Sequence, residues 1–181
     1  MTATRATPRI PFCAAPRPKP SFLRIGVIGA GLSGLVCTTD LVAAGHEVVV
    51  FEKSRGLGGR IASRRVEGTV VDHGMPAFWS DGALRRIALA LPETPRRISL
   101  PVGDAQGDRQ SAGAPWGYPD GLTRLPKQMA AGTDVRLSVR ISTIRLLGDG
   151  IELGDEHGNG QGRFDRLVIS APAPQAADLL D

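Results

Sequence analysis

The sequence predicts an α/β fold built around a parallel sheet, and three consecutive segments near its start carry that prediction. Residues 25–28 form a short β-branched run that is typical of a buried strand. Residues 32–44 then place apolar side chains at helical spacing, and residues 47–52 form a second apolar run that suits a strand covered on both faces. A strand, a helix and a second strand in this order make one parallel crossover unit.

The helix of this unit has an expected face and an expected end. We expect its apolar stripe to face the core, because one face of a helix must pack on the sheet. Gly45 is placed to end the helix, since glycine adopts the left-handed conformation that closes many helices. The residues expected on the core-facing stripe are Leu32, Leu35, Val36, Val42 and Ala43.

The first strand and the helix are joined by Gly29-Ala30-Gly31-Leu32-Ser33-Gly34, which matches the pattern GxGxxG. Gly29 permits a tight turn, Gly31 leaves no Cβ in the path of a pyrophosphate, and Gly34 lets the helix lie close to the strand. The helix N-terminus directs free N–H groups and a partial positive charge at the same point. The residues expected to bind a dinucleotide here are Gly29, Gly31, Leu32, Ser33 and Gly34.

Glu52 stands at the carboxyl end of the second predicted strand, 18 residues after Gly34. A carboxylate at this place accepts hydrogen bonds from both ribose hydroxyls of an adenosine, and it repels a 2′-phosphate. The alternative is a glycine-rich turn in an ordinary α/β domain, since such turns are common. The order of strand, glycines, helix, strand and acid favours the dinucleotide site.

A second glycine-rich loop, Ser54-Arg55-Gly56-Leu57-Gly58-Gly59-Arg60, follows directly. An NAD-dependent dehydrogenase does not need such a loop at this place. A protein whose cofactor has two phosphates and a long second half does, because the loop can contact the diphosphate. Gly58 and Gly59 admit backbone near the ligand, and Arg60 can bring its guanidinium to the pyrophosphate. The alternative for Arg60 is a surface salt bridge, and for Arg55, Arg64 and Arg65 the surface interpretation is favoured.

The excess positive charge of the chain is concentrated at its start. The formal net charge is +4, and five basic residues precede the first acidic residue, Asp40. Without those five the 181-residue chain carries 17 basic and 18 acidic residues, so we expect no nucleic-acid partner. Residues 1–22 are rich in proline and arginine and are predicted to be disordered, with a targeting segment as the alternative.

Several further classes of function are not expected. No apolar run is long enough to cross a bilayer, so no membrane partner is predicted. Cys13 and Cys37 are the only cysteines and imply no disulfide framework, which favours a reducing, cytoplasmic setting. No cluster of Cys, His and carboxylates has metal-ligand spacing. His73 lacks a paired acid or nucleophile and is interpreted as a packing or hydrogen-bonding residue, so no catalytic residue is predicted.

Four motifs together resemble a known family. GAGLSGL, VFEK, GLGGR and Asp72-His73-Gly74 are similar to the FAD-binding half of the flavin amine oxidase superfamily, and within it to the renalase-like proteins. The resemblance implies FAD as the cofactor and an Asp-His-Gly turn close to the flavin ring. Pro119-Asp120-Gly121-Leu122 loosely matches a turn that opens a helix in the family. Cofactor-binding roles are thereby implied for Glu52, Lys53, Gly59, Arg60 and Gly74.

The resemblance also implies a Rossmann-like FAD/NAD(P)-binding fold, in which an antiparallel β-meander replaces a crossover helix. Residues 135–137 would form the third parallel strand, and residues 167–169 would rejoin the parallel sheet. Ile141 falls where the family uses a main-chain N–H and C=O to hold the edge of the adenine. The expected domains are a tail at 1–22, an FAD-binding domain at 23–75 and 117–181, and the start of a reduced substrate lobe at 76–116.

The residues by themselves predict further elements. Residues 81–91 predict a helix capped by Asp81, and residues 93–115 predict a loop. Gly148-Asp149-Gly150 predicts a hairpin turn between two strands, and residues 163–170 predict one further strand. The two tryptophans either line a ligand cavity or are buried against the sheet.

The implied reaction is that of a flavin oxidase. A small-molecule substrate, either a reduced nicotinamide or an amine, would pass a hydride to the flavin, and O2 would reoxidise the flavin to give peroxide. The resemblance covers residues 24–172, and we expect a truncated form of such an enzyme. The alternative is a non-catalytic or vestigial dinucleotide-binding fragment, while an NAD-dependent dehydrogenase is disfavoured by the second glycine loop. No feature of the sequence predicts an oligomeric state.

Overall fold

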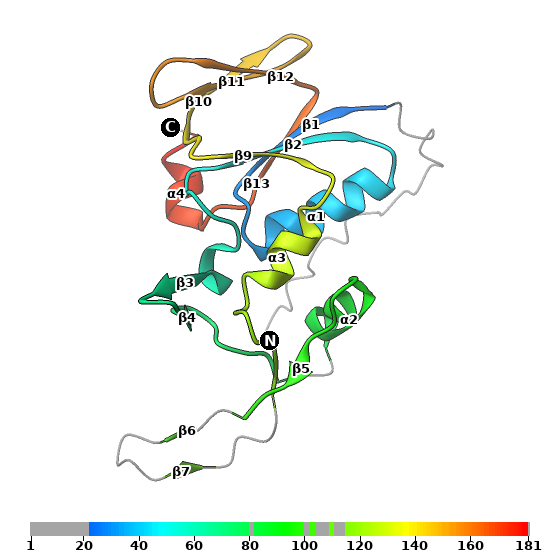
Figure 1. The fold of residues 1–181 in the computed structure, drawn as a ribbon. Coiled ribbons are helices and arrows are strands. Elements are labelled where there is room, and N and C mark those ends of the chain that lie inside the picture. Colours follow the sequence, from blue (N-terminus) through cyan, green and yellow to red (C-terminus); the bar gives the residue numbers. More distant parts are fainter. Residues whose placement is uncertain (1–21, 80–81, 100–101, 104–108, 111–114, 181) are drawn as a thin grey trace, which may run out of the picture.

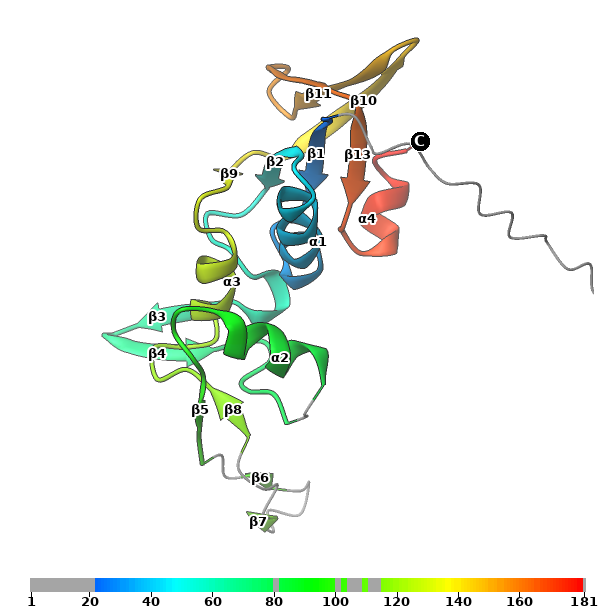
Figure 2. The same cartoon turned by 90° about the vertical axis from the view of Figure 1, so that its right-hand side faces the viewer.

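The computed structural model describes residues 22–79, 82–99, 102–103, 109–110 and 115–180. The predicted disordered tail therefore lies outside the described residues except for Phe22, and so does Asp81, the expected helix cap. Figures 1 and 2 show a four-stranded sheet with a small meander above it in these views, and a group of short strands and helices below it.

A parallel sheet in the order β13-β1-β2-β9 organises the molecule (Figure 1). In the register of this sheet, Ile28 at the end of β1 lies between Phe51 of β2 and Ile169 of β13. The order confirms the α/β prediction, including the third parallel strand and the strand that rejoins the sheet. Its strands are β1 (Arg24–Ile28), β2 (Glu47–Glu52), β9 (Asp134–Leu137) and β13 (Arg166–Ile169).

Helix α1 (Leu32–Ala43) packs on one face of the sheet, and the chain turns at Gly45 as predicted. Gly45 has a φ of +88°, and its N–H donates to the Val42 carbonyl at 2.9 Å. The predicted core stripe is wrong at its end, since Val42 is 46% exposed and Ala43 is exposed as well. Burial is confined to the first part of the helix, where it lies closest to the sheet, at Gly34, Leu35 and Thr38.

Strand β2 is covered on both faces, as its continuous apolar run predicts. Val50 points into one core with Leu35 of α1, whereas Phe51 points into a second core with Leu153 and Phe164. Phe51 and Phe164 meet edge to face, with ring centroids 5.7 Å apart. Because successive side chains of a strand point to opposite faces, β2 holds the helical layer on one side and the meander on the other.

The meander lies between β9 and β13 in the chain and replaces a crossover helix, as predicted. Gly148 and Asp149 make the turn between its first two strands, also as predicted. The single strand predicted for residues 163–170 is wrong, because the chain leaves the meander at Phe164 and enters the parallel sheet at Arg166. The strands are β10 (Ile141–Leu147), β11 (Gly150–Asp155) and β12 (Gly160–Phe164).

The lower elements of Figure 1 include the predicted helix, present as α2 (Ala83–Ala90). The predicted loop at 93–115 is wrong in part, since β5 pairs with β8 and β6 pairs with β7. These two-residue strands carry no alternating apolar pattern, so periodicity does not find them. The elements are β3 (Ser63–Val66), β4 (Thr69–Asp72), β5 (Arg96–Arg97), β6 (Val102–Gly103), β7 (Arg109–Gln110), β8 (Trp116–Gly117) and α3 (Arg124–Met129).

The two tryptophans have different surroundings. Trp116 packs against the core on the α1 side of the sheet and lies between two guanidinium groups, with Arg85 at 4.8 Å and Arg97 at 4.5 Å from the ring centroid. Trp79 is 49% exposed. Trp116 is itself half-buried, so neither tryptophan is fully buried.

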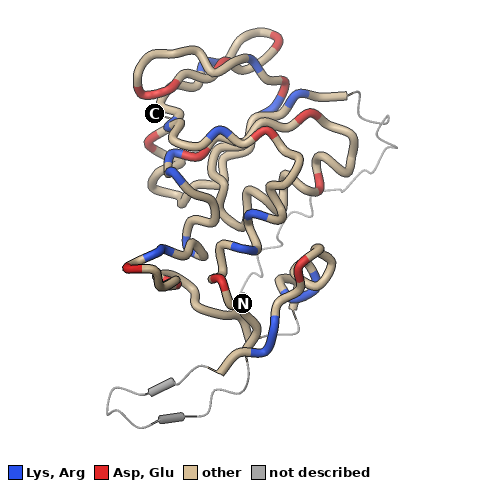
Figure 3. The backbone as a smooth tube through the Cα atoms, viewed as in Figure 1, with Lys and Arg blue, Asp and Glu red and all other residues tan. Residues whose placement is uncertain are grey.

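The structure also shows how charged residues are spread and how long its apolar helices are. Figure 3 shows basic and acidic residues interspersed over the meander, the sheet and the lower elements, which fits the near balance of charge outside the tail. In the described parts of the chain, no helix has both the length and the apolar character needed to cross a membrane.

The turn between β11 and β12 depends on one carboxylate, that of Asp155. It accepts hydrogen bonds from the N–H groups of His157 and Asn159 and from the side-chain amides of Asn159 and Gln161, at 2.8 to 3.0 Å. The Asn159 side-chain bond is the main cause that lowers the pKa of Asp155 below its ordinary value of 3.8. A depressed pKa means that the carboxylate stabilises the fold above the ordinary pKa and ceases to do so as pH falls through the lowered value.

We expect Asp155→Asn to lower the melting temperature by a few degrees at neutral pH, because an amide would face the donors of this turn with a donor of its own. The difference from wild type should narrow as pH falls below 3.8, where the native carboxylate also begins to protonate. Thermal unfolding followed by circular dichroism at several pH values measures both effects. Asp149→Asn, at a side chain that is 81% exposed, is the control, and an equal loss in both variants contradicts the prediction.

Candidate functional site

The two glycine-rich turns lie in contact with each other. Gly31 and Gly58 form an isolated parallel bridge, and the Gly58 N–H donates to the Ala30 carbonyl at 2.9 Å. Gly59 opens the short helix η1 (Gly59–Ile61), and a Cβ built on it would lie 3.6 Å from the Cα of Gly31. The structure therefore brings together the two motifs that the sequence separates by more than twenty residues.

The three glycines of the first turn serve different purposes. Gly29 has a φ of +105°, which makes the tight turn after β1. A Cβ on Gly34 would lie 2.1 Å from the Gly29 carbonyl oxygen, so α1 can approach the strand end only with glycine there. A Cβ on Gly31 would meet no atom within 4 Å. Gly29 and Gly34 are thus explained by the fold, while Gly31 borders open space.

The Glu52 carboxylate lies beside the first turn. Its side chain is buried, at 7% exposure, and Oε2 accepts a hydrogen bond from the Ala30 N–H at 2.8 Å. Oε1 accepts one from the Ser54 N–H at 2.8 Å. Each carboxylate oxygen has a second lone pair, so the group can accept further hydrogen bonds, as the ribose prediction requires. Residues Ala30 and Ser54 were not predicted as partners, because backbone donors leave no mark in the sequence.

The connection from β9 to β10 crosses the same end of β2. The Val139 N–H donates to the Glu52 carbonyl and the Ser138 N–H to the Ser54 carbonyl, each at 3.0 Å. This path leads into Ile141, whose side chain is 4% exposed and packs in the core between sheet and meander. Ile141 therefore follows two residues after Val139, whose N–H bonds the main-chain carbonyl of Glu52.

The basic residues predicted for the site are exposed. Arg60 follows the second turn, and within the described residues its guanidinium makes no ion pair, so the surface salt bridge is not formed there. Lys53 Nζ donates to Gln175 Oε1 at 2.8 Å, which links the end of β2 to α4 (Ala173–Ala177). Ser33 is exposed at the start of α1, and Leu32 beside it is half-buried.

Backbone packing requires a glycine at position 74, and the sequence alone did not reveal this. A Cβ on Gly74 would lie 2.0 Å from the Arg60 carbonyl oxygen, to which the Met75 N–H donates at 2.9 Å. The glycine thus lets the Asp-His-Gly turn pack on the second glycine turn. His73 is exposed, and no group of His, Cys, Asp and Glu in the described ranges is arranged to hold a metal ion.

Asp72 joins the Asp72-His73-Gly74 turn to the turn at Pro119-Asp120-Gly121-Leu122. Its Oδ1 accepts hydrogen bonds from the Leu122 N–H at 2.8 Å and from the Ser63 hydroxyl at 2.6 Å. The Ser63 hydroxyl in turn accepts one from the Thr123 N–H at 2.9 Å. Asp72 thus bonds the backbone of the turn that precedes α3.

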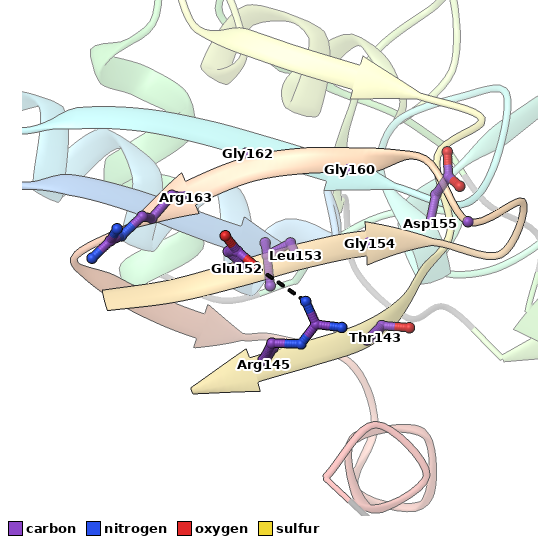
Figure 4. Close-up of a pocket in the computed structure, with 10 residues that line it drawn as sticks. Thr143, Arg145, Glu152, Leu153, Gly154, Asp155, Gly160, Gly162 and Arg163 are labelled. Atoms are coloured by element: carbon purple, nitrogen blue, oxygen red, sulfur yellow. Dashed lines mark hydrogen bonds and ion pairs between the residues drawn. The ribbon is translucent and has the colours of Figure 1, made fainter. Parts of the chain in front are cut away.

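A hollow of about 640 Å³ lies away from these turns, on the strands of the meander (Figure 4). Glycines of β11 and β12 border it, and its charges are paired within it or at its rim, Arg145 with Glu152 at 3.3 Å and Arg163 with Asp149. No residue of the two glycine turns lines it. The arrangement at Glu52 and the paired turns therefore remains the candidate site.

Comparison with known proteins identifies the family. Residues 27–90 match the NAD(P)-binding Rossmann-like domain, and residues 89–181, just over half of the chain, match the flavin containing amine oxidoreductases. The chain belongs to the flavin-containing amine oxidoreductase family. FAD is accordingly its cofactor, and the open space at Gly31, the N-terminus of α1 and the acceptor at Glu52 fit such a dinucleotide.

This chain matches only part of the length of each relative. A 4,4'-diapophytoene desaturase from Staphylococcus aureus (strain Newman) is 38% identical over 64 residues, which are 33% of this chain and 13% of the desaturase. A solved variant of putrescine oxidase superposes with a TM-score of 0.67 at 14% identity, over 88% of this chain and 60% of the other. A putative protoporphyrinogen oxidase from Exiguobacterium sp. 255-15 gives 0.67 at 13% identity, over 88% and 62%. The chain thus spans about 60% of these solved structures, and likeness at this identity shows the shared fold.

We expect Gly34→Ala to destabilise the protein by about 2 kcal/mol or more, because its methyl group would overlap the Gly29 carbonyl and force α1 away from the sheet. Gly31→Ala should change the free energy of unfolding by only about 0.5 kcal/mol, since its methyl group would enter open space. Denaturant unfolding of the two variants measures the difference. Similar losses of unfolding free energy in the two variants would contradict the different surroundings described for Gly31 and Gly34.

Proposed function

We propose that this chain binds FAD across its two glycine turns and acts as a flavin oxidase toward a small-molecule substrate. The observation that carries the proposal is the Glu52 carboxylate, held by the Ala30 and Ser54 N–H groups beside the bridge between Gly31 and Gly58. In this arrangement the ribose acceptor and the open side of the glycine turn adjoin one another, as one adenosine diphosphate requires.

The chain's own residues have distinct tasks in this proposal. Glu52 accepts hydrogen bonds from the adenosine ribose, and the first turn with the N-terminus of α1 donates N–H groups to the diphosphate. Arg60, exposed and free of ion pairs within the described residues, adds positive charge on the far side of the diphosphate. Lys53 and the backbone at Ile141 border the adenosine, and Gly74 borders the flavin half. When bound, FAD supplies the two-electron redox chemistry.

Purified wild-type protein is expected to bind FAD and become yellow, whereas Gly31→Val should lose binding while keeping its fold, because the side chain enters the space of the diphosphate. Glu52→Gln should weaken binding about tenfold or more, since an amide cannot accept from both N–H groups and the ribose together. Titration of FAD, followed by flavin fluorescence and by calorimetry, measures both effects.

The same titration with NAD tests the alternative of a nicotinamide-dependent dehydrogenase. Tighter binding of NAD than of FAD would overturn the proposal, and so would wild-type protein that stays colourless after FAD is added. Lys127→Ala, which changes a basic residue of α3 outside the proposed site, is the control and should bind FAD as wild type does.

For the substrate, we propose the renalase-like choice, a reduced nicotinamide, ahead of an amine, and its support is the resemblance of the Asp72-His73-Gly74 turn and the turn at Pro119-Asp120-Gly121-Leu122 to the renalase-like proteins. In the reaction the reduced nicotinamide would lose a hydride, which carries two electrons and one proton, and O2 would take these up together with one further proton from water to form H2O2. We expect a reduced nicotinamide dinucleotide to bleach the bound flavin without oxygen, and putrescine to leave it yellow. Bleaching by the amine alone would reverse the assignment, and bleaching by neither would favour a non-catalytic dinucleotide-binding role.

A further inference from the structure

Ser170 follows β13 directly, at the point where the chain passes the first glycine turn. Its N–H donates to the Ile28 carbonyl at 2.9 Å and so extends the pairing of β13 with β1 by one residue. Its Oγ lies 3.0 Å from the Ile28 carbonyl oxygen and 3.0 Å from the Gly29 carbonyl oxygen. A serine hydroxyl has one proton, so the two carbonyls share it.

The Ser170 side chain also occupies the space that two glycines leave beside the turn. A Cβ on Gly29 would lie 2.7 Å from Ser170 Oγ, and a Cβ on Gly34 would lie 2.6 Å from it. Both separations are shorter than a van der Waals contact, so a side chain on either glycine would displace the Ser170 hydroxyl. The hydroxyl is therefore built into the strand-to-helix junction rather than resting on its surface.

The peptide between Gly29 and Ala30 is bonded at both ends by distant segments. Ser170 Oγ donates to its C=O, and Glu52 Oε2 accepts from its N–H at 2.8 Å. A peptide that follows glycine can rotate at little cost, because glycine tolerates both signs of φ. With both ends bonded, rotation of this peptide would break two hydrogen bonds together, so its plane is fixed.

We propose that Ser170 is a positioning residue for the dinucleotide site, which fixes the Gly29–Ala30 peptide so that the turn presents its N–H groups to a diphosphate. This inference rests on the proposed binding of FAD at the glycine turns. Ser170 acts through the peptide and not by contact with the cofactor. Its contribution is preorganisation, since a turn that is already in its binding shape loses less conformational freedom when the ligand arrives.

The test compares Ser170→Ala with Thr39→Ala. The Thr39 hydroxyl donates to the Leu35 carbonyl at 2.9 Å within α1, so both variants lose one bond from a hydroxyl to a backbone carbonyl, and only the first loses it at the turn. The dissociation constant of FAD should rise about fivefold in Ser170→Ala and stay within about twofold of wild type in Thr39→Ala. Melting temperatures of the FAD-free proteins report any general loss of stability.

Hydrogen exchange of the FAD-free proteins gives a second readout that needs no bound cofactor. Amides of residues 29–35 should exchange faster in Ser170→Ala than in Thr39→Ala or wild type. If wild type binds FAD, an unchanged affinity in Ser170→Ala overturns the inference. If wild type does not bind FAD, the proposed function fails, and the exchange rates alone decide whether Ser170 fixes the turn, unchanged rates overturning that role.

Discussion

The buried carboxylate of Glu52 is the constraint on which the rest of the site depends. A carboxylate at 7% exposure is costly unless hydrogen bonds compensate for the lost water, and here the Ala30 and Ser54 N–H groups supply them. One belongs to the first glycine turn and the other begins the second glycine-rich loop. Satisfying one side chain at the end of β2 therefore holds both turns together.

The topology of the sheet makes this convergence possible. Because its four strands are parallel, their carboxyl ends meet at one edge, where α/β proteins bind dinucleotides. β1 leads into the first glycine turn, β2 ends at Glu52, and β13 ends at Ile169, directly before Ser170. β9 continues into a segment whose N–H groups bond the carbonyls of Glu52 and Ser54. Every strand of the sheet thus contributes its end to the same site.

Proteins that share this fold are named for different reactions. A putrescine oxidase, a protoporphyrinogen oxidase and a fatty acid isomerase share the fold at 13 to 14% identity and carry names of different reactions. One fold thus carries different chemistries, since function resides in the groups around the reacting centre rather than in the fold. The family and the cofactor therefore rest on the match of residues 89–181 to the flavin containing amine oxidoreductases, and the substrate is assigned by proposal.

The sequence by itself determined the crossover unit, the glycine pattern and the place of Glu52 at the end of the second strand, because these depend on local periodicity and on short spacing along the chain. The mutual contact of the two glycine turns, the backbone reason for Gly74 and the contacts of Ser170 were decided only by the tertiary structure. Ser170 lies 141 residues from Gly29 in the chain and reaches it through the pairing of β13 with β1. The short strands β5 to β8 and the break at Asp165 likewise depend on long-range pairing, which no local pattern records.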